Sequence, residues 1–132
     1  MRIDFTLTLP GLFEIVNICR LARDFNVDIL AKVVFAFTPD IAMSPLFLPK
    51  RILHAYIDEL LLTDQVDNRT IRQMLKDLKQ RPTFEEEYPQ DFAKARIKGK
   101  WRMQALDKLR GGMQFRDTLK TIQAREFWDE IC

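Results

Sequence analysis

Near its start the chain reads Ile3-Asp4-Phe5-Thr6-Leu7-Thr8-Leu9, with an apolar side chain at every second position. This period of two is typical of a half-buried β-strand, because successive side chains of a strand point to opposite faces of the sheet. Pro10 and Gly11 end the alternation. Pro10 suits the first turn of a helix, where the N–H that it lacks would have had no partner. The sequence therefore predicts a strand that is followed at once by a helix.

The next residues predict that helix and then a second strand. Apolar residues recur at helical spacing, at Leu12, Ile15, Val16, Cys19 and Ala22. Asn26 can adopt the left-handed conformation that ends a helix. The apolar run over residues 27–37 lacks alternation, which favours a strand covered on both faces. A strand, a helix and a strand with short joins form a right-handed βαβ unit with two parallel strands.

After residue 37 the pattern becomes helical. Residues 38–49 hold three prolines and predict an ordered loop at the carboxyl edge of the sheet. We expect helices after Pro49, after Asp67 or Asn68, over residues 91–110 and over residues 115–131. The third of these should stop at Gly111 and Gly112. Thr83 and Glu86 have the spacing of a capping box within the polar linker 81–90.

These elements predict an α/β fold. It consists of one βαβ unit with two parallel strands, followed by a mostly helical C-terminal half. The length of 132 residues suits a single domain, with the βαβ part over residues 1–48 and the helical part over residues 49–132.

Composition narrows the class of protein. The chain has 21 Lys and Arg against 19 Asp and Glu, and the two signs are interspersed, so no strong field points at nucleic acid or at a membrane. Two cysteines, Cys19 and Cys132, argue against a disulfide framework and favour the cytoplasm. Neither a signal peptide nor an apolar run long enough to span a bilayer is found. We therefore expect a cytoplasmic protein without a membrane partner.

Two strands are too few for a stable parallel sheet. We expect the sheet to be completed by a second copy or by another protein. Large apolar residues near the C-terminus also require a surface to cover them, either the chain's own core or another subunit. The candidate interface residues are Ile3, Phe5, Leu7, Phe127, Trp128 and Ile131.

Several short phrases share an order with one known family. They are Phe5-Thr6-Leu7-Thr8, residues 21–27, Val33 to Pro39, Met43-Ser44 with Leu48-Pro49-Lys50, and Leu106 to Gly111 with Phe115 to Leu119. In this order they resemble the C-terminal part of radical SAM proteins of the twitch-domain-containing type. The resemblance covers most of the chain and implies the last barrel repeats plus the C-terminal helices.

The resemblance also implies what this chain lacks. Members of the family hold a [4Fe-4S] cluster with three cysteines in a CxxxCxxC loop, because a cluster needs thiolate ligands and one open iron for S-adenosylmethionine. No such loop is present, so we expect no cofactor in this chain unless it is part of a complete family member. By the same resemblance, Phe35, Phe37, Thr38 and Pro39 would lie near the adenine of S-adenosylmethionine.

The favoured hypothesis is therefore an incomplete radical SAM-like module, without its own iron–sulfur site, that acts in protein–protein association or as an accessory fragment. One alternative is a module that binds nucleic acid or a partner with the basic helix over residues 94–102, although alternate spacing spreads those charges around the helix. The other is a small enzyme of unknown type, with Asp40, Asp58 or Glu59 at the mouth of the sheet. His54, as the single histidine, and Cys19, in an apolar stripe, are expected to be structural.

Overall fold

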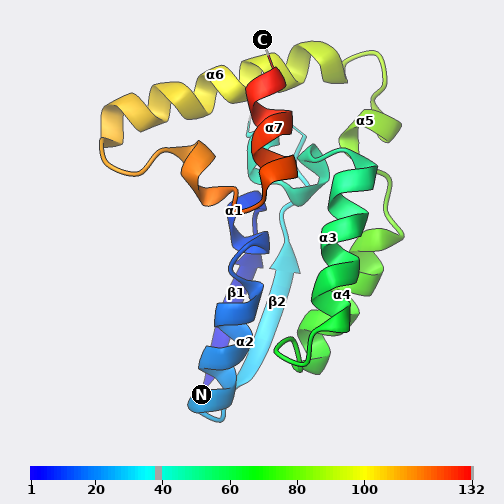
Figure 1. Cartoon of the computed structure of the whole chain (residues 1–132), viewed down its shortest axis with the longest axis vertical. Coiled ribbons are helices and arrows are strands. Elements are labelled where there is room, and N and C mark those ends of the chain that lie inside the picture. Colours follow the sequence, from blue (N-terminus) through cyan, green and yellow to red (C-terminus); the bar gives the residue numbers. More distant parts are fainter. Residues whose placement is uncertain (38–39, 132) are drawn as a thin grey trace.

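The structure is a computed structural model that describes residues 1–37 and 40–131 (Figure 1). Its elements follow the order β1 (Arg2–Leu7), α1 (Leu9–Leu12), α2 (Ile15–Asp24), β2 (Asp28–Val33), η1 (Ile41–Met43), η2 (Pro45–Phe47), α3 (Lys50–Leu62), α4 (Arg69–Lys79), α5 (Phe84–Glu87), α6 (Phe92–Arg110), η3 (Phe115–Thr118) and α7 (Ile122–Glu130). The two strands form one parallel sheet, and helices make up the C-terminal half. The predicted α/β class, with two parallel strands and a helical second half, is confirmed.

The sheet is limited by the length of its first strand. β1 pairs with β2 from Arg2 opposite Asp28 to Leu7 opposite Val33, and the last bond runs from the Val34 N–H to the Leu7 carbonyl at 3.0 Å. Beyond Leu7 the chain turns into α1, so the residues after Val34 have no strand to pair with in the part of the chain that the structure describes. β2 therefore ends at Val33, and the prediction that strand structure extends to Phe37 was wrong.

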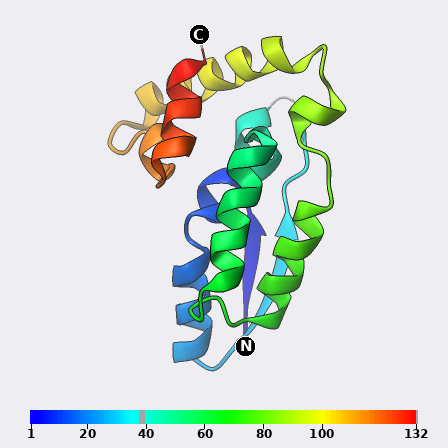
Figure 2. The same ribbon diagram turned by 45° about the vertical axis from the view of Figure 1, so that its right-hand side comes forward.

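Helices cover one face of the sheet. The odd-numbered residues of both strands point to this face, where Leu7 and Ile29 are buried. Figure 2 shows α2, α3 and α4 on the same side of the two strands. The even-numbered residues point the other way and are exposed, including Leu30. The prediction that the second strand is covered on both faces was therefore wrong, because all three helices pack on one side.

The helical half is built around Phe47 in η2. Its ring lies 6.1 Å from Phe92 of α6 and 5.4 Å from Phe127 of α7, measured between centroids. The long helix α6 crosses above the rest of the fold, and α7 packs beneath it (Figure 1). The Lys100 ammonium of α6 donates to the carbonyls of Trp128 and Ile131, at 2.8 and 2.9 Å, and so holds the C-terminal end of α7.

Most predicted helix boundaries are confirmed. Pro49 precedes α3, the Asn68 side chain caps α4 by accepting from the Ile71 N–H at 3.1 Å, and Thr83 and Glu86 form the capping box of α5. Gly111 ends α6 with a φ of +68°, which favours glycine.

Two predicted helices are each divided in the structure. The helix after Pro10 is interrupted at residues 13–14, between α1 and α2. The final helix is divided into η3 and α7 by residues 119–121. At the second break Thr121 caps α7 by accepting from the Ala124 N–H at 3.2 Å. The sequence analysis relied on the apolar spacing and did not identify Thr121 as the start of a new helix.

Candidate association surface

The sheet has a face that no helix of the described residues covers. Its side chains are Arg2, Asp4, Thr6, Asp28, Leu30 and Lys32, all exposed. Arg2 and Asp4 form an ion pair of 3.1 Å on this face. Parallel sheets are normally covered on both faces, so a two-stranded parallel sheet with one bare face is an unusual surface for an isolated chain.

Both edges of the sheet are unpaired within the described residues. In a parallel pair the N–H and C=O of one residue point to the same side, and successive residues alternate. The hydrogen bond from the Val34 N–H to the Leu7 carbonyl therefore determines which residues of each strand point their backbone groups outward. In β1 the groups of Asp4 and Thr6 point outward, and in β2 those of Ala31 and Val33 do so. These are the groups that a further strand would bond.

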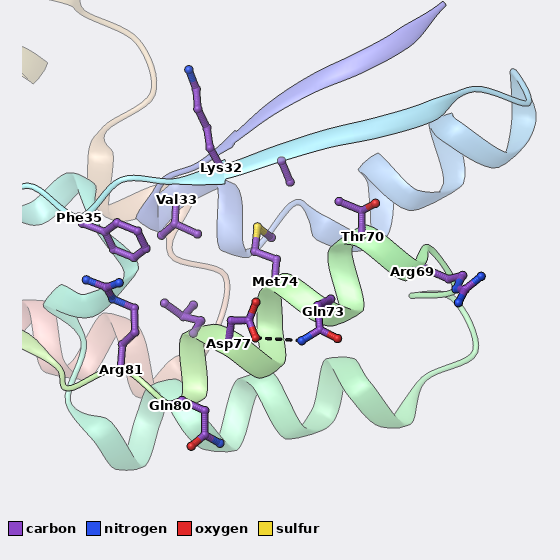
Figure 3. Close-up of a pocket in the computed structure, with 12 residues that line it drawn as sticks. Lys32, Val33, Phe35, Arg69, Thr70, Gln73, Met74, Asp77, Gln80 and Arg81 are labelled. Carbon is purple, nitrogen blue, oxygen red and sulfur yellow. Dashed lines mark hydrogen bonds between the residues drawn. The ribbon is translucent and has the colours of Figure 1, made fainter.

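A groove of about 1020 Å³ lies along the outer edge of β2. Val33 lines it from the strand and Met74 lines it from α4 (Figure 3). Ala31 of β2 and Leu78 of α4 also line the groove. These four side chains give the groove an apolar floor directly beside the free backbone groups of β2.

The rim of the groove is mostly basic. Arg69 lies at one end of the groove and Arg81 at the other (Figure 3). The Arg81 guanidinium stacks on the Phe35 ring, with its central carbon 3.7 Å from the ring centroid. The single carboxylate of the lining, Asp77, accepts a hydrogen bond from the Gln73 amide at 2.9 Å, whereas the Lys32 side chain points away from the groove to the bare face of the sheet (Figure 3).

The structure separates the residues that the family resemblance places near a cofactor. Phe35 belongs to the groove beside β2. Phe37 instead packs on Tyr88, with ring centroids 4.2 Å apart, and lines a second cavity of about 560 Å³ under α6. Thr38 and Pro39 lie outside the described residues. The two aromatic residues therefore do not share one cavity.

The proposed interface residues lie mainly inside the chain's own core. Phe127, Trp128 and Ile131 are between 2 and 7 % exposed, and Leu7 is fully buried. The three C-terminal residues are covered by this chain's core, one of the two alternatives that the sequence left open. Ile3 and Phe5 are half-buried on the covered face of the sheet. At the outer edge of β1 it is the backbone N–H and C=O groups of Asp4 and Thr6, not these apolar side chains, that face outward.

The basic stretch of α6 has a pattern that sequence reasoning missed. Lys94, Lys98 and Arg102 are four residues apart, so they share one helix face and line the cavity under α6. Arg102 forms an ion pair with Asp40. Lys100 faces α7 instead. The basic residues of α6 are thus divided between a solvated helix face and a structural contact with α7. The spacing of four residues in the sequence could have revealed the shared face.

The other reactive residues have structural surroundings. Cys19 is 1 % exposed, and burial raises the pKa of its thiol, which disfavours the reactive thiolate. His54 has a buried Nε2 without a hydrogen-bond partner in the described structure. Burial, and then Lys79 and Lys50, lower the pKa of His54. Asp58 is paired with Lys79 at 2.6 Å.

Among residues 1–37 and 40–131, no three His, Cys, Asp or Glu side chains are grouped closely enough to hold a metal ion. In the same part of the chain, no helix has both the length and the apolar character needed to cross a bilayer. In comparisons with known proteins, no family model, no curated protein and no solved structure matched the chain.

Proposed function

We propose that this chain is a protein–protein association module, in which β1 pairs with β1 of a second copy to form a four-stranded sheet. The observation that carries the proposal is that the described part of the chain forms a parallel sheet of only two strands, with one bare face and an unpaired β1 edge. Each added strand pair satisfies backbone groups and extends the sheet toward a size that is stable in water.

The charges favour β1 over β2 as the self-associating edge. An antiparallel copy of β1 can bring Arg2 of one chain opposite Asp4 of the other, which is a self-complementary arrangement. Two copies that met through β2 would bring together two rims that each carry Arg69 and Arg81. Like charges placed opposite each other are destabilising, so the β2 edge is unsuited to a second copy.

Light scattering coupled to size exclusion, over a dilution series at low and high salt, tests this proposal. We expect a species of twice the chain mass of 15.6 kDa, which dissociates on dilution. Asp4→Pro should give a monomer, because proline has no N–H to donate at the outer edge of β1. Asp4→Ala keeps that N–H and should retain most of the dimer. A wild-type chain that stays monomeric at every concentration would refute self-association.

A second candidate function rests on the family resemblance. A parallel strand pair joined by a helix, open at both edges, is also how one repeat of a larger parallel sheet is built, and β1 and β2 have this form. In that case the chain is the C-terminal portion of a radical SAM-like protein, and β1 pairs with a preceding strand of that protein.

Calorimetric titration with S-adenosylmethionine tests this second candidate. Binding that is weakened by Phe37→Ala would support it. Phe35→Ala, in the separate groove beside β2, is the matched control. No heat of binding at millimolar ligand would leave self-association as the better account.

A further inference from the structure

The groove between β2 and α4 differs from the β1 edge in both shape and charge. It combines the outward backbone groups of Ala31 and Val33 with an apolar floor formed by Met74 and Leu78. An edge strand beside an apolar groove is the arrangement by which sheets bind extended peptides, since the backbone gives affinity and alternate side chains enter the groove. We propose that this groove binds an extended acidic segment of a partner protein, which adds to the sheet as a third strand beside β2.

The length of the segment follows from the positions of the two arginines. Arg69 and Arg81 are 12 residues apart at opposite ends of α4 and the turn after it. At a helical rise of about 1.5 Å per residue, they are separated by roughly 18 Å. A strand advances about 3.3 Å per residue, so carboxylates five or six positions apart reach both guanidinium groups.

The charge of the partner follows from the free cations. Neither arginine forms an ion pair in the part of the chain that the structure describes, and the Phe35 ring holds the Arg81 guanidinium at its end of the groove. Asp77 is the one carboxylate in the lining, against the two arginines, because the Lys32 side chain points to the bare face of the sheet. Arginine binds a carboxylate through two parallel hydrogen bonds, so an acidic residue at each end of the segment is the complementary partner.

The pattern of the segment follows from the alternation of a strand. Side chains that point to the helix-covered side should be acidic, apolar, apolar and acidic, to match Arg69, the floor residues Met74 and Leu78, and Arg81. Side chains in between point to the bare face of the sheet and can be small and polar. In an antiparallel arrangement, the residues that face α4 also bond the backbone of Ala31 and Val33.

A fluorescein-labelled, end-capped peptide, Glu-Thr-Val-Thr-Val-Thr-Glu, tests the proposal by fluorescence anisotropy with the whole chain. We expect saturable binding that weakens as salt rises. Ala31→Pro should weaken binding about fivefold or more, because it removes one outward N–H while the bonds from β2 to β1 remain. Asp4→Pro, on the other edge of the sheet, should bind the peptide as the wild type does.

Two further peptides and one double variant distinguish the contribution of backbone hydrogen bonds from that of the terminal charges. A peptide with proline in place of both valines should bind at least tenfold more weakly, since it cannot donate to β2. A peptide with lysine at both ends should not bind the wild type but should bind the double variant Arg69→Glu/Arg81→Glu. This exchange of charge should preserve the fold, because both arginines are exposed. The charge-exchange test therefore remains valid even if Ala31→Pro does not fold.

The proposal fails if Ala31→Pro folds and binds the peptide as tightly as the wild type, or if the lysine peptide binds equally well. It also fails if a labelled 15-nucleotide oligothymidylate binds the chain more tightly than the peptide and competes with it, because the arginines would then recognise phosphate. These outcomes are independent of the mass measurement above. The dimer is broken by Asp4→Pro and the peptide complex by Ala31→Pro.

Discussion

His54 lies where its protonation costs stability. Its Nε2 is buried and has no hydrogen-bond partner among the described residues. Burial together with Lys79 and Lys50 outweighs the opposite effect of Asp58 and Glu86, so the pKa of His54 in the folded state lies below the ordinary 6.5. Between the two pKa values the unfolded chain binds the proton and the folded chain does not. Stability is therefore fully present above pH 6.5 and is lost as the pH falls through this window.

Because His54 is the single histidine, its titration can be followed directly by NMR. We expect a pKa below 6.5, and a free energy of unfolding that declines from pH 7 to pH 5 in urea titrations. His54→Gln should flatten this decline. The carboxylates of Glu86 and Asp129, whose pKa values are lowered by hydrogen bonds, titrate at lower pH and do not interfere. A measured pKa above 6.5 would contradict the structural account.

Gly99 lets α6 approach η1 closely. A methyl group at this position would overlap the Ile41 Cγ2. We expect Gly99→Ala to destabilise the fold by about 1–3 kcal/mol through overpacking, despite a gain of about 1 kcal/mol in helix propensity. The measurement is urea unfolding.

The control for Gly99→Ala is the same change in an Ile41→Ala background. There the overlapping group is absent, so the cost should fall or reverse. A Gly99→Ala chain that is more stable than the wild type would show that the two segments are not in contact. The sequence alone does not predict this role of Gly99, because the role depends on a segment more than fifty residues away.

At the scale of elements, the basic stretch of α6 carries a structural contact. Lys100 donates to the last carbonyls of α7, at Trp128 and Ile131, whereas Lys98 has no hydrogen bond or ion pair among the described residues. Cations at a helix C-terminus also interact favourably with the helix dipole.

Replacing Lys100 by Met should therefore destabilise the fold by about 1–3 kcal/mol, since two carbonyls lose a charged donor. Lys98→Met is the matched control on the same helix and should change the free energy of unfolding by less than about 0.5 kcal/mol. Chemical denaturation followed by tryptophan fluorescence measures both, because Trp128 lies at the contact. Equal effects of the two substitutions would contradict the assignment.

The elements also show which signals the sequence carried. Alternation located β1, and prolines, caps and apolar spacing located α3, α4 and α6, because these depend on neighbours in the chain. The end of β2 depends on the length of β1, and α1, which a short turn separates from α2, packs against η1 and η2. Neither feature has a signal in the neighbouring sequence. The sequence analysis therefore predicted β2 to be too long and predicted α1 and α2 to be one helix.

For the whole molecule, the α/β class with two parallel strands could be predicted, whereas the groove beside β2 could not; a partner that completes the sheet stays a prediction. The sequence indicated two strands, and two strands are too few. It named Phe127, Trp128 and Ile131 as interface candidates because large apolar residues near a terminus need a cover, but the core around Phe47 supplies that cover. The groove beside β2 joins residues of β2 and α4, which no local pattern relates.

Self-association through β1 predicts that thermal stability depends on protein concentration. A dimer that forms from folded chains stabilises the folded state by mass action, so the melting temperature should rise as the concentration increases. Each tenfold increase adds up to about 1.4 kcal/mol per dimer formed, which corresponds to a shift of a few degrees in a domain of this size. Scanning calorimetry over a hundredfold range of concentration measures the shift.

Two variants identify the edge that is responsible. Asp4→Pro should melt at one temperature at all concentrations, because it cannot form the dimer, whereas Ala31→Pro should keep the wild-type dependence, since it alters only the outer edge of β2. If Ala31→Pro alone abolished the dependence, the copies would pair through β2, and the groove could not be free for an acidic segment. If neither variant changed it, the association would use the helical half, and the bare sheet would remain open to solvent in the assembly.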